Sequence, residues 1–214
     1  MMKKFVCAML VLTMLLGCAL AEGTGTELWA HEAGWTSFSI AISRDGSDEV
    51  WEEAAKTFSE SMGMNLTGVQ LKTMVLQGHS LENGVEELSV EGNRIIGRKA
   101  DGTELFSHEY AEAELVEDPG IMSGARVHVF HTEEANAGEY TWLLLTEPQQ
   151  VEKDGASYTT FNLVCTQKDD YHTLFDMENG QNEPVAVCAL IEKDVTAEGL
   201  ALVINNFFSP TAKK

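Results

Sequence analysis

The chain has 214 residues, of which 34 are acidic and 14 are basic, so its formal net charge at pH 7 is −20. A field of this sign repels nucleic acids and anionic membranes, and it attracts cations weakly and without selectivity. The composition therefore argues against a nucleic-acid-binding protein and favours an acidic soluble one, in which the charge can also serve solubility alone.

Residues 1–21 have the three regions of a secretory signal peptide. Lys3 and Lys4 precede an apolar run that ends at Leu16, and Ala19-Leu20-Ala21 offers a cleavage site. The apolar run is shorter than the roughly 20 residues that a membrane-spanning helix needs. We therefore predict a signal peptide over residues 1–21, a secreted or periplasmic protein, and a single domain over residues 22–214.

A second processing signal overlaps the first. Leu15-Leu16-Gly17-Cys18 resembles a bacterial lipobox, in which the cysteine is lipidated, so a protein anchored to the membrane at Cys18 is the alternative. Cleavage after Ala21 leaves Cys165 and Cys188 as the remaining cysteines. In a compartment that permits disulfides they form either a disulfide or two buried thiols, and the sequence leaves both open.

The N-terminal part predicts one strand and one or two helices. Trp35–Ile42 is rich in aromatic and β-branched residues, which predicts a strand. A helix follows, with Asp48 as its N-cap. The apolar residues of that helix share one face: Trp51, Ala54, Ala55 and Phe58. Leu66–Gln77 is ambiguous between helix and strand, and we favour a second helix ending near Gly78.

From Val85 onward, short alternating segments separated by turn signals indicate a β-meander. Glu139–Cys165 is predicted to form two of its strands, joined by a polar turn. Eight or nine strands suit a closed barrel, and apolar spacing from about Ala197 predicts a terminal helix that docks on the sheet. The fold class is therefore mainly β: a lipocalin/calycin-like antiparallel up-and-down barrel with one or two N-terminal helices and a C-terminal helix.

Several motifs occur in the order and spacing of a known family. Trp35-Thr36-Ser37 is followed by an Asp45-Gly46 turn and an acidic helix, and Val85–Thr103 gives a strand, a Glu-Gly turn and a second strand. Weaker matches are Gly124, Arg126, Tyr140 and Met177-Glu178-Asn179. In these motifs the chain, roughly from Trp29 to Asn205, resembles the ZinT (YodA-like) family of extracytoplasmic zinc-binding proteins. The resemblance implies zinc as the ligand and metal-uptake machinery as a partner.

The zinc ligands of that family do not reappear at the matching positions. The family uses three histidines, and alignment through Tyr140 and Met177 places them near Thr146 and on Ser157 and Thr159. Neutral hydroxyls are poor zinc ligands because they stay protonated at neutral pH. We therefore expect zinc binding to be weak or lost at these positions.

Two other groups of residues have side chains that can bind metal ions. Asp169, Asp170 and His172 offer carboxylates and an imidazole within four residues, which suits a loose divalent site, although a solvated loop is the alternative. His128 and His131 are the closest histidine pair, but they fall on opposite faces of a strand and cannot share one ion without a bulge.

The sequence has no Gly-x-Ser-x-Gly elbow and no cysteine in a recognisable catalytic setting, so we expect a protein that is not an enzyme. Our functional prediction is an exported ZinT-like metal-binding protein with weak or lost zinc binding. The alternative is a lipocalin-like protein that holds a small apolar ligand inside its barrel.

Overall fold

The computed structural model describes residues 25–44, 47–78, 84–117, 126–167 and 187–208. Its helices are η1 (Thr26–Trp29), α2 (Phe38–Ile42), α3 (Asp48–Met62), α4 (Gly68–Gly78), η2 (Gly138–Tyr140) and α5 (Ala197–Phe208). Its strands are β1 (Trp35–Ser37), β2 (Glu87–Glu91), β3 (Arg94–Arg98), β4 (Glu104–Glu109), β5 (Ala111–Val116), β6 (Val127–His131), β7 (Trp142–Thr146), β8 (Gln149–Lys153), β9 (Ala156–Thr166) and β10 (Cys188–Glu192). The predicted signal peptide and the Asp169–His172 stretch lie outside the described residues.

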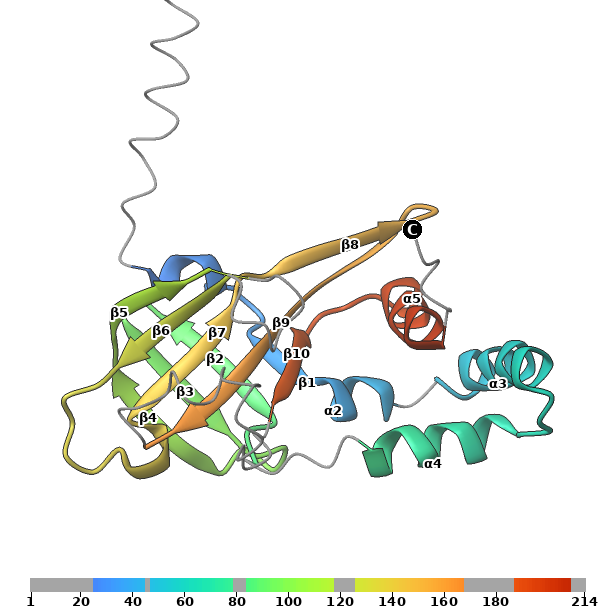
Figure 1. Ribbon diagram of the computed structural model, residues 1–214, viewed down its shortest axis with the longest axis horizontal. Coiled ribbons are helices and arrows are strands. Elements are labelled where there is room, and N and C mark those ends of the chain that lie inside the picture. Colours follow the sequence, from blue (N-terminus) through green and yellow to red (C-terminus); the bar gives the residue numbers. More distant parts are fainter. Residues whose placement is uncertain (1–24, 45–46, 79–83, 118–125, 168–186, 209–214) are drawn as a thin grey trace, which may run out of the picture.

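The strands of the described residues form one antiparallel sheet that curls into a nearly closed barrel (Figure 1). Their order is β4-β3-β2-β1-β10-β9-β7-β6-β5, with β8 paired to β9 beside this path. The two ends of the path, β4 and β5, are joined in the chain through Tyr110. The mainly β, lipocalin-like barrel with flanking helices is therefore confirmed.

Large apolar side chains fill the barrel interior. They alternate with outward residues along each strand, as the period of two requires. The interior cluster includes Trp29, Trp35, Leu88, Phe106, Phe130, Leu143, Leu145, Phe161 and Leu163. Burying one such side chain contributes about 1.5–3 kcal/mol. On β9, Phe161 and Leu163 belong to this interior cluster, and Cys165 packs against it.

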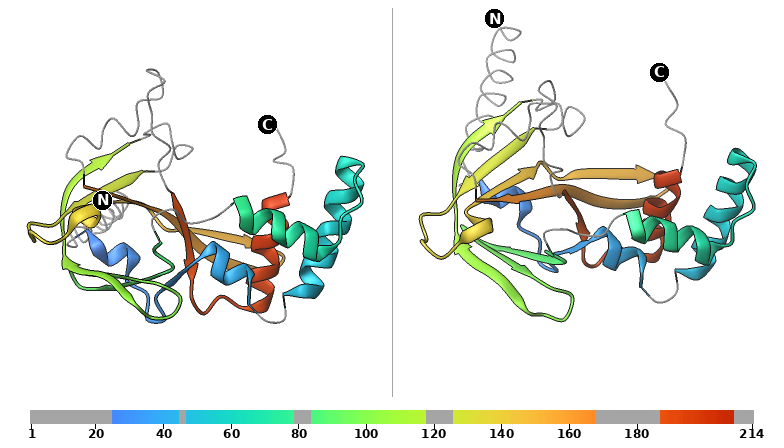
Figure 2. Two further views of the ribbon diagram at one scale, coloured as in Figure 1. Left: turned by 90° about the horizontal axis from the view of Figure 1, so that it is seen from below. Right: turned by 60° about the horizontal axis from the view of Figure 1, so that its bottom comes forward.

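A second apolar cluster lies between the helices and the end of the barrel. Its buried residues come from α2, α3, α4 and α5, and β10 contributes Ile191. The β8–β9 hairpin reaches from the barrel to α5, so that the barrel and the helices share one long strand (Figure 2). Among the described helices, none combines the length and the hydrophobicity that a bilayer crossing demands.

Two N-terminal boundaries differ from the prediction. The strand predicted over Trp35–Ile42 ends at Ser37, because the Ser37 hydroxyl accepts a hydrogen bond from the Ile40 amide and starts α2. Asp48 is not the cap of α3. Ser47 occupies that position without a side-chain capping bond, and Asp48 lies in the first turn, 3.7 Å from the Lys72 ammonium. The second helix ends at Gly78 as predicted.

The segment predicted as a polar turn before β9 contains a strand. β8 pairs with the first half of β9, and β7 pairs with its second half. Glu147 and Pro148 separate β7 from β8, and proline has no amide hydrogen to donate to a ladder. The polar composition of β8 reflects its position outside the barrel, where four of its five residues are exposed.

Candidate functional site

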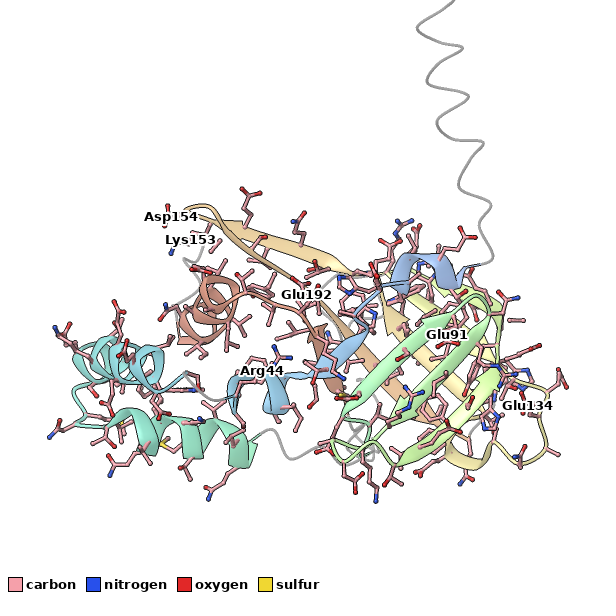
Figure 3. The ribbon with its side chains drawn as sticks, turned by 180° about the vertical axis from the view of Figure 1, so that it is seen from behind. Arg44, Glu91, Glu134, Lys153, Asp154 and Glu192 are labelled. Carbon is pink, nitrogen blue, oxygen red and sulfur yellow. The ribbon has the colours of Figure 1, made fainter. Side chains whose placement is uncertain are left out.

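A cleft of about 440 Å³ opens where β9 and β10 leave the barrel and α5 begins. We call it the β9–β10 cleft. It is lined by His31, Gly155, Ala156, Ser157, Thr159, Glu192, Asp194, Val195, Thr196 and Glu198. Glu192 lies between the barrel and α5, beside the hairpin whose tip carries Lys153 and Asp154 (Figure 3). Most of the lining is polar, in contrast to the barrel interior.

His31 is held by the turn that connects η1 to β1. Its carbonyl accepts a hydrogen bond from the Gly34 amide, and its ring lies 5.2 Å from the ring of Trp35, measured between centroids. Gly34 has a φ of 73°, a conformation that residues with a Cβ rarely adopt, so the turn favours glycine there. The local sequence therefore orients the imidazole at the edge of the cleft.

The carboxylates come from the end of β10 and the start of α5. Glu192 is the last residue of β10, Asp194 lies in the following turn, and Glu198 is in the first turn of α5. The Glu192 carboxylate accepts a hydrogen bond from the Thr159 amide and so ties β10 to β9. Gly199 allows α5 to approach β9, because a Cβ there would lie 2.4 Å from the Ser157 carbonyl oxygen.

The electrostatic character of the cleft is acidic. The three carboxylates have no Lys or Arg among the described residues that line the cleft. Lys193 lies between Glu192 and Asp194 in the sequence, but its ammonium group is 2.8 Å from the Glu87 carboxylate. A cation that entered the cleft would therefore meet carboxylates that are not already neutralised by a lining lysine or arginine.

His31 is the polar group of the cleft with unused hydrogen-bonding capacity. Its Nδ1 atom is buried and has no hydrogen-bond partner among the described residues, and its Nε2 atom is 3.7 Å from Asp194 Oδ1, beyond hydrogen-bond distance. A buried polar atom without a partner costs about 1–3 kcal/mol. The imidazole thus has a ring nitrogen that a ligand could engage once a movement of the side chain exposes it.

A hydrolytic triad does not form from Ser157, His31 and Asp194. In such a triad one ring nitrogen bonds the carboxylate and the other accepts the serine proton. Here Nδ1 has no partner and Nε2 faces Asp194, so no ring nitrogen accepts the Ser157 hydroxyl.

As arranged, the side chains do not form a closed metal site either. Within the described ranges, no three His, Cys, Asp or Glu groups converge so that they could hold a metal ion. The cleft does bring together ligand types that divalent cations accept, an imidazole and carboxylates, beside three hydroxyls. Binding of an ion there requires side-chain movement, and this lowers the affinity.

His128, one of the predicted candidates, lies inside one end of the barrel and is 7% exposed. Its Nδ1 is 2.5 Å from Glu112 and its Nε2 is 3.2 Å from Glu147, so both ring nitrogens have a carboxylate partner. Its ring packs edge to face on Trp29 with 5.0 Å between centroids. His128 therefore serves as a satisfied core histidine in this structure.

Glu147 shows how this end of the barrel is stabilised. Partial burial opposes its ionisation, but hydrogen bonds from His128 and Arg126 outweigh that effect and hold the pKa of Glu147 below its usual value. The Arg126 guanidinium is 2.5 Å from the carboxylate. Arg126, Glu147, His128 and Glu112 thus form a connected ion-pair network.

His131 faces the other side of β6, as the alternation predicts. Its ring lies 4.1 Å from the ring of Trp142, and its Nδ1 is 3.4 Å from Glu133. His128 and His131 are therefore not brought together. The remaining candidates, Asp169, Asp170 and His172, lie outside the described residues, so they stay a prediction.

The three positions aligned with the family's histidines are separated in the structure. Thr146 is 2% exposed, and its hydroxyl accepts a hydrogen bond from the Asn162 amide within the sheet. Ser157 and Thr159, by contrast, line the β9–β10 cleft. The part of β9 that aligns with the family's ligand positions therefore borders the candidate site.

No sequence motif predicted that the acidic residues of the cleft would form a site. Glu192, Asp194 and Glu198 are three of 34 acidic residues, and no motif distinguishes them. His31 was not among the predicted metal ligands. These residues meet because β1 pairs with β10, which places the chain preceding β1 beside the chain following β10.

No model of a protein family matches the sequence, and no curated protein matches it. Two solved structures are similar in fold. The Zn(II)-bound ZinT-like domain of Streptococcus pneumoniae AdcA has a TM-score of 0.52 and 12% identity, over 87% of this chain and 93% of that one. Zn(II)-bound AdcA from the same organism has a TM-score of 0.50 and 11% identity, over 85% of this chain and 34% of that one. The chain thus spans about a third of the length of AdcA. These likenesses show that it has the fold of a ZinT-like domain.

Proposed function

We propose that this protein is an exported, ZinT-like barrel that binds a divalent cation, zinc among them, in the β9–β10 cleft. The observation that carries the proposal is the His31 imidazole, which has a buried nitrogen without a partner among the described residues and lines one cleft with three carboxylates, of which Asp194 is 3.7 Å from its Nε2 atom. Likeness to two Zn(II)-bound structures supports a cation as the ligand. Export and a metal-uptake partner remain part of the proposal, with membrane attachment only if Cys18 is lipidated.

The affinity is lower than that of a three-histidine zinc site. One imidazole and carboxylates leave much of the coordination sphere to water, and the hydroxyls of Ser157 and Thr159 stay protonated and neutral. A site dominated by carboxylates also discriminates poorly between zinc and the harder cations calcium and magnesium. Calcium or magnesium in excess should therefore compete with zinc.

The barrel interior offers little support for the alternative, a small apolar ligand. The positions where such a ligand would lie are occupied by fully buried rings and leucines, including Trp29, Phe130, Phe161 and Leu145, each no more than 1% exposed. A ligand would have to displace this packing, which costs several kcal/mol.

Calorimetric titration of untagged, chelator-treated protein with zinc tests the proposal. We expect weak one-to-one binding that His31→Ala reduces tenfold or more, because the ion loses its one nitrogen ligand in the cleft. His131→Ala is the matched control, since His131 is a partly exposed histidine on a different strand and should leave the isotherm unchanged.

The outcomes separate the candidate sites. Zinc binding that survives His31→Ala but is abolished by His172→Ala would move the site to Asp169–His172. Tight binding that neither variant weakens would contradict both assignments, and absence of any zinc binding would contradict the function itself.

A further inference from the structure

The two cysteines of the described residues lie on neighbouring strands inside the barrel. Cys188 on β10 pairs with Leu163 on β9, so Cys165 is two residues further along β9 on the same face. Cys188 is fully buried in the interior cluster, and Cys165 packs against that cluster. Both are in the thiol form in this structure.

The spacing of the two residues is close to that of a bridge. Diagonal neighbours on paired antiparallel strands have Cα atoms about 7–8 Å apart, with their Cβ atoms somewhat closer. Disulfides span Cα distances up to about 6.8 Å. Because bonded cysteines have Cβ atoms about 3.5–4.5 Å apart, β9 and β10 must approach each other locally before the two sulfurs can bond. In the thiol form Cys188 donates a hydrogen bond to the Val85 carbonyl at 3.3 Å, so formation of the disulfide also requires the Cys188 side chain to leave this bond.

The native barrel protects both thiols from reaction. Burial, together with the nearby Glu86 charge, raises the pKa of Cys188 to about 12 from 9.0. Burial, followed by the proximity of Cys188, raises the pKa of Cys165 well above its ordinary value. Because the thiolate is the nucleophile in thiol–disulfide exchange, folding lowers the reactive fraction of both cysteines.

We propose that Cys165 and Cys188 are joined by a disulfide across β9 and β10, which forms while the exported chain folds and is enclosed when the barrel closes. The oxidant is a small or protein disulfide. One cysteine thiolate attacks it and releases one thiol, and the second cysteine then resolves the mixed disulfide and releases the other. Two hydrogens are lost from the protein in total, and the oxidant's disulfide becomes two thiols.

Thiol titration of protein recovered after export, or of the chain from Glu22 refolded with oxidised and reduced glutathione, tests this inference. In denaturant without reductant, we expect no titratable thiol and an intact mass about 2 Da below that of the reduced chain. The thermal midpoint should fall by roughly 5–10 °C when the bond is reduced before refolding.

Cysteine variants distinguish the effect of the disulfide on stability from the effect of side-chain packing. Cys165→Ala, Cys188→Ala and the double variant should each have a thermal midpoint that reductant does not change, whatever their own stability. Reduced native protein should also react with a disulfide reagent at least a hundredfold more slowly than the same protein in denaturant. Two titratable thiols after oxidative refolding, or a bond between two chains, would overturn the proposal.

Discussion

The polar groups of the barrel interior are paired, whereas those of the β9–β10 cleft are partly unpaired. In the barrel, His128 has a carboxylate on each ring nitrogen, and the Trp29 indole donates to the Thr146 carbonyl at 2.9 Å. In the cleft, His31 leaves Nδ1 without a partner and its neighbouring carboxylates lack a lining cation. The two regions are connected through the single long strand β9.

This contrast indicates which region of the fold can bind a ligand. A filled interior with satisfied hydrogen bonds contributes stability and leaves little room for a ligand. An open cleft with unsatisfied groups contributes less stability, but a ligand can gain the missing interactions. Substitutions should therefore affect folding in the barrel and affinity in the cleft.

The largest expected effect is on stability, from Trp29→Ala in the barrel. The indole is 1% exposed and packs against Phe130 and Phe161, so its removal leaves a cavity and should lower the free energy of unfolding by about 3–5 kcal/mol. Urea denaturation measures the change. Leu28→Ala, in the same short helix but at a residue 53% exposed, should change it by about 0.5 kcal/mol or less. Equal losses in the two variants would remove the distinction between interior and surface.

The next effect is a gain of affinity in the cleft. Ser157→His combined with Thr159→His places two imidazoles on the face of β9 that borders His31, which approaches a three-histidine zinc site. Calorimetry should show zinc affinity higher by on the order of 100-fold. Gln149→His combined with Val151→His is the control, because it puts the same i, i+2 pair on the opposite face of the hairpin. An equal gain in the control would mean that the two introduced histidines bind zinc without help from the residues of the cleft.

The smallest effect concerns acid. The pKa of Glu147 is lower in the folded protein than its ordinary value of 4.5, so its ion pairs stabilise the fold above about pH 4.5 and are lost as the pH falls through the folded pKa. Glu147→Gln should therefore cost up to about 1 kcal/mol at pH 7 and almost nothing near pH 3. Urea midpoints at both pH values test this, with the exposed Glu49→Gln as control. A difference that persists unchanged at pH 3 would show that Glu147 acts through packing rather than charge.

Much of the fold could be predicted because local patterns are strong where one face is buried. The face shared by Trp51, Ala54 and Ala55 indicates α3, and the alternation of Phe161 and Leu163 indicates the inward side of β9. The predicted strand over Trp35–Ile42 was too long, because β-branched and apolar residues suit a buried helix as well as a strand. β8 was missed, because a strand outside the barrel has no apolar face to reveal it.

The sequence by itself determined most of the strand and helix types, the inward side of β9, and the absence of histidine at Thr146, Ser157 and Thr159, since these depend on residue identity and short-range periodicity. Only the tertiary structure decided which histidine is satisfied and which is available. His128 meets Glu112 and Glu147 through pairing of β6 with β5 and β7, whereas His31 meets Asp194 through pairing of β1 with β10. These contacts depend on the order and register of strands that are far apart in the sequence. Burial of the barrel core fixes that order and register, and no local sequence pattern encodes them.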